Sequence, residues 1–179
     1  MKKALVVLGI LSMLAGCAGK PPPKIEIPTN VILIQGKLGA APDVNPDPSG
    51  QPSPVLVRVY ELVSDDVFNR TDFFTLFDHE SAVLGGALLR VRNFPLVPGQ
   101  LVDITGQADP NTQFIGVIAA VRDLDAARWR ASAPLPPKTV QPSLPHQVTA
   151  QIGIARAGVQ LMLGGAPAPE TPAAAPHVQ

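Results

Sequence analysis

Cysteine is almost absent from this chain of 179 residues, which contains a single one, Cys17. One thiol excludes an intramolecular disulfide, and by itself it cannot make a protein-only metal site. A lone cysteine is often a small residue of a buried core. Its position here points elsewhere, because it lies in the segment LAGCAGKPPPK, beside small residues and just ahead of three prolines.

The apolar run at the N-terminus is too short for an ordinary membrane-spanning helix, which needs about 20 residues. The chain starts with MKK and continues with the uncharged segment ALVVLGILSML, which has 11 residues. A basic start, a short apolar run and the small pair Ala15-Gly16 are typical of a secretory signal peptide that is later removed. We therefore predict a signal peptide over residues 1–16 in preference to a membrane anchor.

The four residues Leu14, Ala15, Gly16 and Cys17 resemble the bacterial lipobox. This resemblance implies that the Cys17 thiol receives a diacylglyceryl group and that Cys17 becomes the first residue of the mature chain. Each buried methylene contributes about 0.8 kcal/mol, so two or more acyl chains anchor a protein stably. Residue 18 is Ala rather than Asp, which in enteric-type lipoprotein sorting favours the outer membrane.

A large excess of charge of either sign is absent as well. The chain has 14 Lys plus Arg and 14 Asp plus Glu, and loss of the two lysines of the signal leaves 12 basic residues. No segment is strongly basic, which argues against nucleic acid as a partner.

Residue patterns of a catalytic or metal site are also missing. There is no G-x-S-x-G motif and no phosphate-binding glycine loop. The three histidines, His79, His146 and His177, lack the spacing of metal ligands and are expected to be solvated loop residues. The paired carboxylates at 65–66 and in 122–125 have no adjacent base that acid–base catalysis would need. We expect no enzyme activity, no metal and no cofactor apart from the covalent lipid.

Proline-rich segments divide the chain into parts. Residues 17–28 are predicted to be the lipidated cysteine and an extended tether, which at about 3.1 Å per residue reaches about 30 Å. The tail 164–179, GGAPAPETPAAAPHVQ, has no large apolar residue except Val178 and is predicted to be disordered. The folded domain is therefore expected to cover residues 29–163, the size of one domain.

Alternation of apolar and polar residues with period two predicts about seven strands in this domain. The expected strands are 31–38, 55–62, 87–92, 100–105, 114–122, 147–154 and 159–163. Short strands separated by turn signals are typical of an antiparallel β-sandwich. The predicted fold is therefore mainly β, with seven or eight strands.

One aromatic segment departs from this pattern. Residues 65–84, DDVFNRTDFFTLFDHESAVL, hold four of the chain's six phenylalanines. Thr71 or Asp72 is a suitable N-cap for a short helix there, which makes the segment a helical insertion against the sandwich. Its phenylalanines either belong to the core or form a docking face. The single tryptophan, Trp129, lies between two arginines and either covers the sandwich rim or contacts a partner.

The segment 36–54, GKLGAAPDVNPDPSGQPSP, is predicted to be a long loop between the first two strands. Hairpin loops usually have about 2 to 5 residues, and longer loops in compact domains are usually functional or disordered. Proline reduces the freedom of such a loop and favours a semi-rigid shape. On these grounds alone, a functional loop and an idle loop both stay open.

Several motifs in order resemble the type VI secretion lipoprotein family (TssJ, SciN or VasD). They are NPDPSGQPSP running into VLVRVYEL (45–62), DFFTLF (72–77), VLG (83–85), LVPG (96–99), FIGV (114–117), Arg122-Asp123 and Trp129-Arg130. The resemblance covers about residues 31–154.

This resemblance implies a transthyretin-like β-sandwich with an added helical region. It also implies a lipoprotein on the periplasmic face of the outer membrane that recruits the C-terminal periplasmic domain of the inner-membrane protein TssM, with TssL indirectly in the same complex. In the family the loop between the first two strands makes this contact. The implied contact residues here are Asp43, Asn45, Asp47, Ser49, Gly50 and Gln51. The alternative function is a periplasmic lipoprotein that binds a small molecule.

Overall fold

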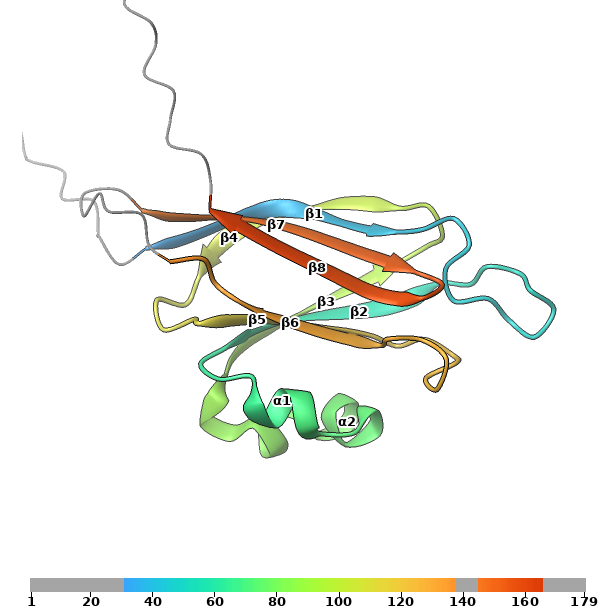
Figure 1. Ribbon diagram of the computed structural model, residues 1–179, viewed down its shortest axis with the longest axis horizontal. Helices are drawn as coiled ribbons and strands as arrows, with labels where there is room; N and C mark the ends of the chain where they lie inside the picture. Colours follow the sequence, from blue (N-terminus) through green and yellow to red (C-terminus); the bar gives the residue numbers. More distant parts are fainter. Residues whose placement is uncertain (1–30, 138–144, 166–179) are drawn as a thin grey trace, which may run out of the picture.

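The computed structural model describes residues 31–137 and 145–165, which form two four-stranded β-sheets and a helical segment (Figure 1). Predictions for the signal peptide, Cys17, the tether and most of the tail lie outside these residues. One sheet has the strand order β4-β1-β7-β8 and the other has the order β3-β2-β5-β6. The strands are β1 (Ile32–Ala40), β2 (Val55–Leu62), β3 (Leu88–Leu96), β4 (Leu101–Ala108), β5 (Phe114–Ala119), β6 (Arg130–Pro134), β7 (His146–Ala155) and β8 (Gly158–Gly165).

The predicted mainly β sandwich is confirmed, and β7 shows why the sequence adopts it. Alternate residues of β7, beginning with Val148, are buried between the sheets, while Gln147, Thr149 and Gln151 face outward and are exposed. β1 pairs with β4 in antiparallel and with β7 in parallel orientation, and all other ladders are antiparallel. Alternation places one apolar row per strand in the core.

The main core lies between the two sheets. Its buried side chains come from both sheets and are chiefly Val, Ile, Leu and Ala, including Val57, Leu38, Ile104 and Ile152. Each fully buried aliphatic side chain of this kind contributes about 1.5–3 kcal/mol relative to an exposed one.

The helical insertion covers the outer face of the β3-β2-β5-β6 sheet (Figure 1). It comprises α1 (Asp66–Arg70), α2 (Phe73–Leu84) and the 3₁₀ turn η1 (Gly85–Ala87). Asp72 is the N-cap of α2, and its side chain accepts a hydrogen bond from the backbone N–H of Thr75 at 3.0 Å. Of the two predicted caps, Asp72 is therefore the one that caps α2.

A second core lies under these helices and contains Tyr60, Leu62, Phe68, Leu76, Leu84 and Ile118. The phenylalanines of this segment differ in burial. Phe68 is fully buried, and Phe73 packs on Phe77 and on Trp129 with ring centroids 5.2 Å apart in each pair. Phe74 is 66% exposed. Trp129 is partly buried against both cores, as expected for a residue that covers the rim.

Several predicted boundaries were wrong. β1 continues to Ala40, because residues 36–39 pair with both β4 and β7 and Ala40 pairs with β7, so the loop is 41–54 rather than 36–54. β6 was not predicted, and β8 ends at Gly165, two residues beyond the expected domain end. His146 was expected to be solvated, but it is the first residue of β7 and is 7% exposed.

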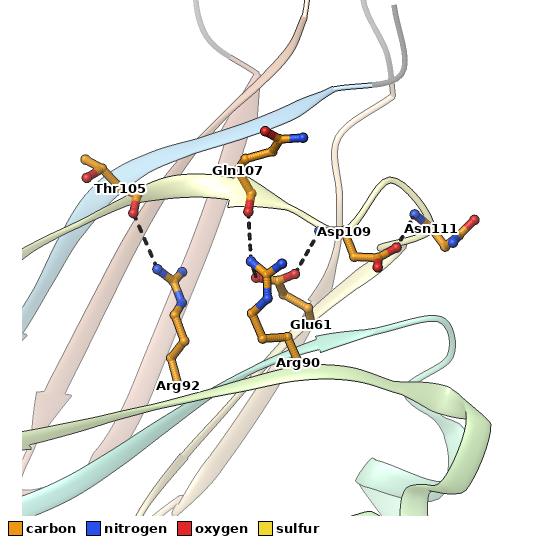
Figure 2. A network of polar contacts seen from close by, with 7 residues as sticks. All are labelled: Glu61, Arg90, Arg92, Thr105, Gln107, Asp109 and Asn111. Atoms are coloured by element: carbon orange, nitrogen blue, oxygen red, sulfur yellow. Dashed lines mark hydrogen bonds and ion pairs between the residues drawn. The ribbon is translucent and has the colours of Figure 1, made fainter. Parts of the chain in front are cut away.

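A polar network closes the edge of the sandwich between β3 and β4 (Figure 2). Glu61 of β2 is 2% exposed, and its carboxylate accepts a hydrogen bond from the backbone N–H of Asp109 at 2.9 Å. Arg90 lies 3.4 Å from this carboxylate and donates to the Gln107 carbonyl oxygen of the other sheet at 2.8 Å. These contacts link the two sheets where the apolar core ends.

Candidate functional site

The loop 41–54 projects from the end of the sandwich where β1 finishes and β2 begins (Figure 1). It is the cyan loop that extends beyond the strands. Its first residue is held to β7, the neighbour of β1 in the same sheet, because the Ala41 N–H donates to the Ile154 carbonyl at 2.7 Å. Val31 lies at the opposite end of β1, about 30 Å from the start of the loop for a strand of nine residues. The chain therefore enters the domain at the end far from the loop.

Two adjacent residues fasten the base of the loop. Val44 is fully buried in the main core. Asn45 is 6% exposed and has a φ of 49°, a conformation that asparagine tolerates better than most residues. Its amide donates to the Pro54 carbonyl at 2.7 Å, and its side-chain oxygen accepts from the backbone N–H of Arg122 at 2.8 Å. Asn45 thus links the start of the loop to the end of the loop and to the segment after β5.

Asp47 organises the tip of the loop. One oxygen of its carboxylate accepts hydrogen bonds from the Ser49 hydroxyl at 2.7 Å and from the backbone N–H groups of Ser49 and Gln51, both at 2.9 Å. The Ser49 hydroxyl is the main cause that lowers the pKa of Asp47, followed by the Gln51 N–H. The Asp47 N–H also donates to the Gln51 carbonyl at 2.8 Å. These hydrogen bonds close the tip into a tight turn.

Two neighbouring segments border the loop. The segment after β5 is held by the Arg122 contact to Asn45, and the turn between β7 and β8 is held by Arg128, which accepts from Val159 at 2.7 Å and donates to Ala157 at 3.1 Å. A cleft of about 470 Å³ opens between the loop and these segments. The surface at this end is therefore built from three segments that are distant in sequence.

The structure brings all six predicted contact residues into this loop but gives them different environments. Asp43, Ser49, Gly50 and Gln51 are exposed, Asp47 is half-buried, and Asn45 is buried. The Asn45 side chain therefore holds the base of the loop. The sequence did not predict that Arg122 and Arg156 lie beside this loop. No local pattern could have shown this, because the contact depends on how the sheets pack.

Metal-ligand groups and membrane-spanning helices are both absent from the described residues. Within 31–137 and 145–165 there is no group of three His, Cys, Asp or Glu side chains that could hold a metal ion. No helix within those ranges has the length and apolar character to cross a membrane.

The chain was compared with known families and proteins. Residues 33–157 match the family described as "Type VI secretion lipoprotein, VasD, EvfM, TssJ, VC_A0113". No curated protein matches the chain.

Solved structures resemble the chain over most of its length. The T6SS lipoprotein TssJ1 from Pseudomonas aeruginosa is 33% identical with a TM-score of 0.68, and the match covers 76% of this chain and 99% of TssJ1. Serratia marcescens Lip, a membrane bound component of the type VI secretion system, is 32% identical with a TM-score of 0.66, over 75% of this chain and 99% of Lip.

A third structure, described as a type VI membrane complex, contains a chain that is 23% identical to this one. Its TM-score is 0.60, over 73% of this chain and 97% of that one, and at this identity the likeness concerns the fold. Together with the match over residues 33–157, these similarities show that the chain belongs to the type VI secretion lipoprotein family.

Proposed function

We propose that the protein is an outer-membrane lipoprotein that faces the periplasm and recruits the C-terminal periplasmic domain of a TssM-type inner-membrane protein. In this proposal Cys17 carries the lipid, residues 17–28 form the tether, and the loop 41–54 makes the contact. A TssL-type protein belongs to the same complex without touching this chain.

The observation that carries the proposal is that the loop 41–54 is held in one shape and lies at the end of the domain opposite Val31. An anchor that precedes β1 leaves the loop pointing away from the membrane that holds the lipid. Because Val44, Asn45 and Asp47 already hold the loop in one shape, little conformational entropy remains to be lost on binding.

The similarity to other proteins supports the same partner. A chain in a structure described as the "T6SS protein TssM C-terminal domain" from EAEC shares this fold, with a TM-score of 0.57 and 22% identity over 72% of this chain and 99% of that chain. The family itself is a structural component of the secretion system, so a protein contact fits better than catalysis.

The alternative, a small-molecule carrier, gains no support from the aromatic segment. It would need a deep apolar pocket beneath the phenylalanines of 68–77. Instead, Phe68 fills the space down to the backbone of Gly116, where an added Cβ would lie 2.8 Å from the ring.

Calorimetric titration tests the loop. Lipid-free residues 18–179 are titrated with the periplasmic domain of the TssM-type protein of the same system. Gln51→Trp places a bulky side chain at the exposed tip, where Gln51 makes only backbone hydrogen bonds. Asn111→Trp is the matched control, because Asn111 is also exposed and bonds through its backbone, at the opposite end of the domain. We expect the first variant to lose binding and the second to bind like the unmodified protein.

Equal binding by both variants would remove the loop from the interface. Absence of binding by the unmodified protein would contradict the choice of partner.

Fractionation tests the anchor. Cys17→Ser removes the thiol that lipidation needs, whereas Ala18→Ser keeps it and leaves a small residue beside it. We expect the first variant to leave the membrane fraction and to lose secretion, and the second to retain both. A Cys17→Ser protein that stayed with the outer membrane would disprove the lipid anchor.

A further inference from the structure

The cleft beside the loop is lined by charged groups of both signs. Asn45 and Asp47 line it from the loop, Arg122 and Asp123 from the segment after β5, and Arg156 from the turn between β7 and β8. Two guanidinium groups and two carboxylates therefore share a space of about 470 Å³.

One oxygen of each carboxylate is already engaged. Asp47 accepts three hydrogen bonds within the tip of the loop, and Asp123 accepts one from the backbone N–H of Ala126 at 3.0 Å. These bonds hold the local turns in place. The carboxylates therefore serve the structure of the cleft walls.

The two guanidinium groups are not engaged in this way. Within the part of the chain that the structure describes, neither the Arg122 nor the Arg156 side chain makes a hydrogen bond or an ion pair, and both residues are exposed. Arg58, in contrast, pairs with Glu80, and Arg90 pairs with Glu61. The cleft thus offers guanidinium donors that make no hydrogen bond within the described residues.

The backbone beneath both arginines is firmly placed. The Arg122 N–H is bound by Asn45, and the turn that carries Arg156 is held against Arg128 at Gly158. Gly158 has a φ of 119°, and a Cβ there would lie 2.2 Å from the Arg128 carbonyl oxygen, so only glycine permits this approach. Two guanidinium groups on fixed backbones at one cleft can converge on an anion, and the charge of Arg122 already helps to lower the pKa of the neighbouring Asp47.

We infer that this cleft receives an acidic side chain of the protein partner, Asp or Glu, with Arg122 and Arg156 as its donors. A guanidinium group matches the two oxygens of a carboxylate and binds it through paired N–H donors. This inference rests on the proposed function, because the carboxylate belongs to the partner that the loop contacts. It adds the chemistry of the contact, which the loop alone does not specify.

Titration of the same TssM-type periplasmic domain at low and at high salt tests this inference. The test variants are Arg122→Gln, Arg156→Gln and the double variant. Arg70→Gln is the matched control, because Arg70 is an exposed arginine of α1 that lies outside the cleft. Unchanged thermal unfolding checks that each variant is folded.

We expect about a ten-fold weaker affinity for each single variant, a larger loss for the double variant, and little change for Arg70→Gln. The affinity of the double variant should also depend less on salt than that of the unmodified protein, since the screened ion pair is gone. Arg122→Lys and Arg156→Lys should retain part of the affinity, because they keep the charge but lose the paired donors.

Unchanged affinity of the double variant, while Gln51→Trp abolishes binding, would overturn this inference and leave the proposed function standing. An equal loss for Arg70→Gln would also overturn it, because the effect would then come from net charge rather than from the cleft. Failure of the unmodified protein to bind would instead reject the proposed function.

Discussion

The side-chain oxygen of Asn45 accepts a hydrogen bond from the backbone N–H of Arg122 at 2.8 Å, across 77 positions of the sequence. The same side chain donates to the Pro54 carbonyl at 2.7 Å. One buried amide therefore joins the start of the loop, its end and the wall of the adjacent cleft. The shape of the candidate partner-binding surface depends on this residue more than on any exposed one.

Asn45→Ala should lower the free energy of unfolding by about 1–3 kcal/mol, because it leaves the Arg122 N–H and the Pro54 carbonyl without their partner. It also places a β-carbon at a positive φ that alanine adopts poorly. Asn45→Gly loses the same hydrogen bonds without this strain and should cost less. Urea unfolding measures both values, and hydrogen exchange of residues 44–53 should accelerate in both variants. Exchange that stayed slow in Asn45→Ala would show that the tip is ordered independently of Asn45.

Gly116→Ala should destabilise the domain by about 1–3 kcal/mol through overpacking. The added methyl would lie 2.8 Å from the Phe68 ring and 3.1 Å from Leu62, both of which are fully buried. Gly86→Ala is the matched control, since a Cβ at Gly86 meets nothing within 4 Å. Urea unfolding compares the two, and the double variant Gly116→Ala with Phe68→Leu should recover part of the loss. Equal stability of the two alanine variants would contradict the close packing of Phe68.

Glu61→Ala should cost more than Arg90→Ala, although the two side chains form one ion pair. The Glu61 side chain is 3% exposed and that of Arg90 is 46% exposed. Loss of Glu61 also leaves the Asp109 N–H without its partner, so we expect about 3 kcal/mol for Glu61→Ala and about 1 kcal/mol for Arg90→Ala. Chemical unfolding of each variant measures this order, and the reverse order would contradict the role of Glu61 in joining the sheets.

Acid should loosen two local structures before it affects the cores. The pKa of Asp47 is lowered chiefly by the Ser49 hydroxyl, and that of Asp72 chiefly by the Thr75 N–H. Because each pKa is lower in the folded state, both groups contribute stability above their unfolded pKa values, and this contribution is lost as pH falls through the folded ones. NMR titration should therefore give low pKa values at both positions. Asp47→Asn should reduce the pH dependence of hydrogen exchange at the tip, whereas Asp72→Asn should reduce it in the first turn of α2.

Period-two alternation in the sequence predicted β7 well, because this strand has one buried row and one exposed row. β2 and β5 were predicted too, but β5 and the second half of β2 are buried on both faces, since the helical insertion adds a second core there. β6, with the sequence RASAP, has no such alternation. It becomes a strand because its backbone pairs with β5 in antiparallel orientation. Residues 36–39 carry two glycines and read as a loop, but they lie between β4 and β7 and pair with both. Pairing on two sides outweighs a weak local preference.

The sequence by itself determined the class of the fold, the aromatic insertion, the position of the long loop and the family, since each depends on local patterns or ordered motifs. Only the tertiary structure decided that Asn45 is buried and holds the base of the loop, and that Arg122 and Arg156 lie beside the loop. The parallel pairing of β1 with β7, more than 100 positions apart, brings Ile154 to Ala41 and with it the turn of Arg156. Such neighbours are set by sheet topology and core packing, which no local pattern in a single chain encodes.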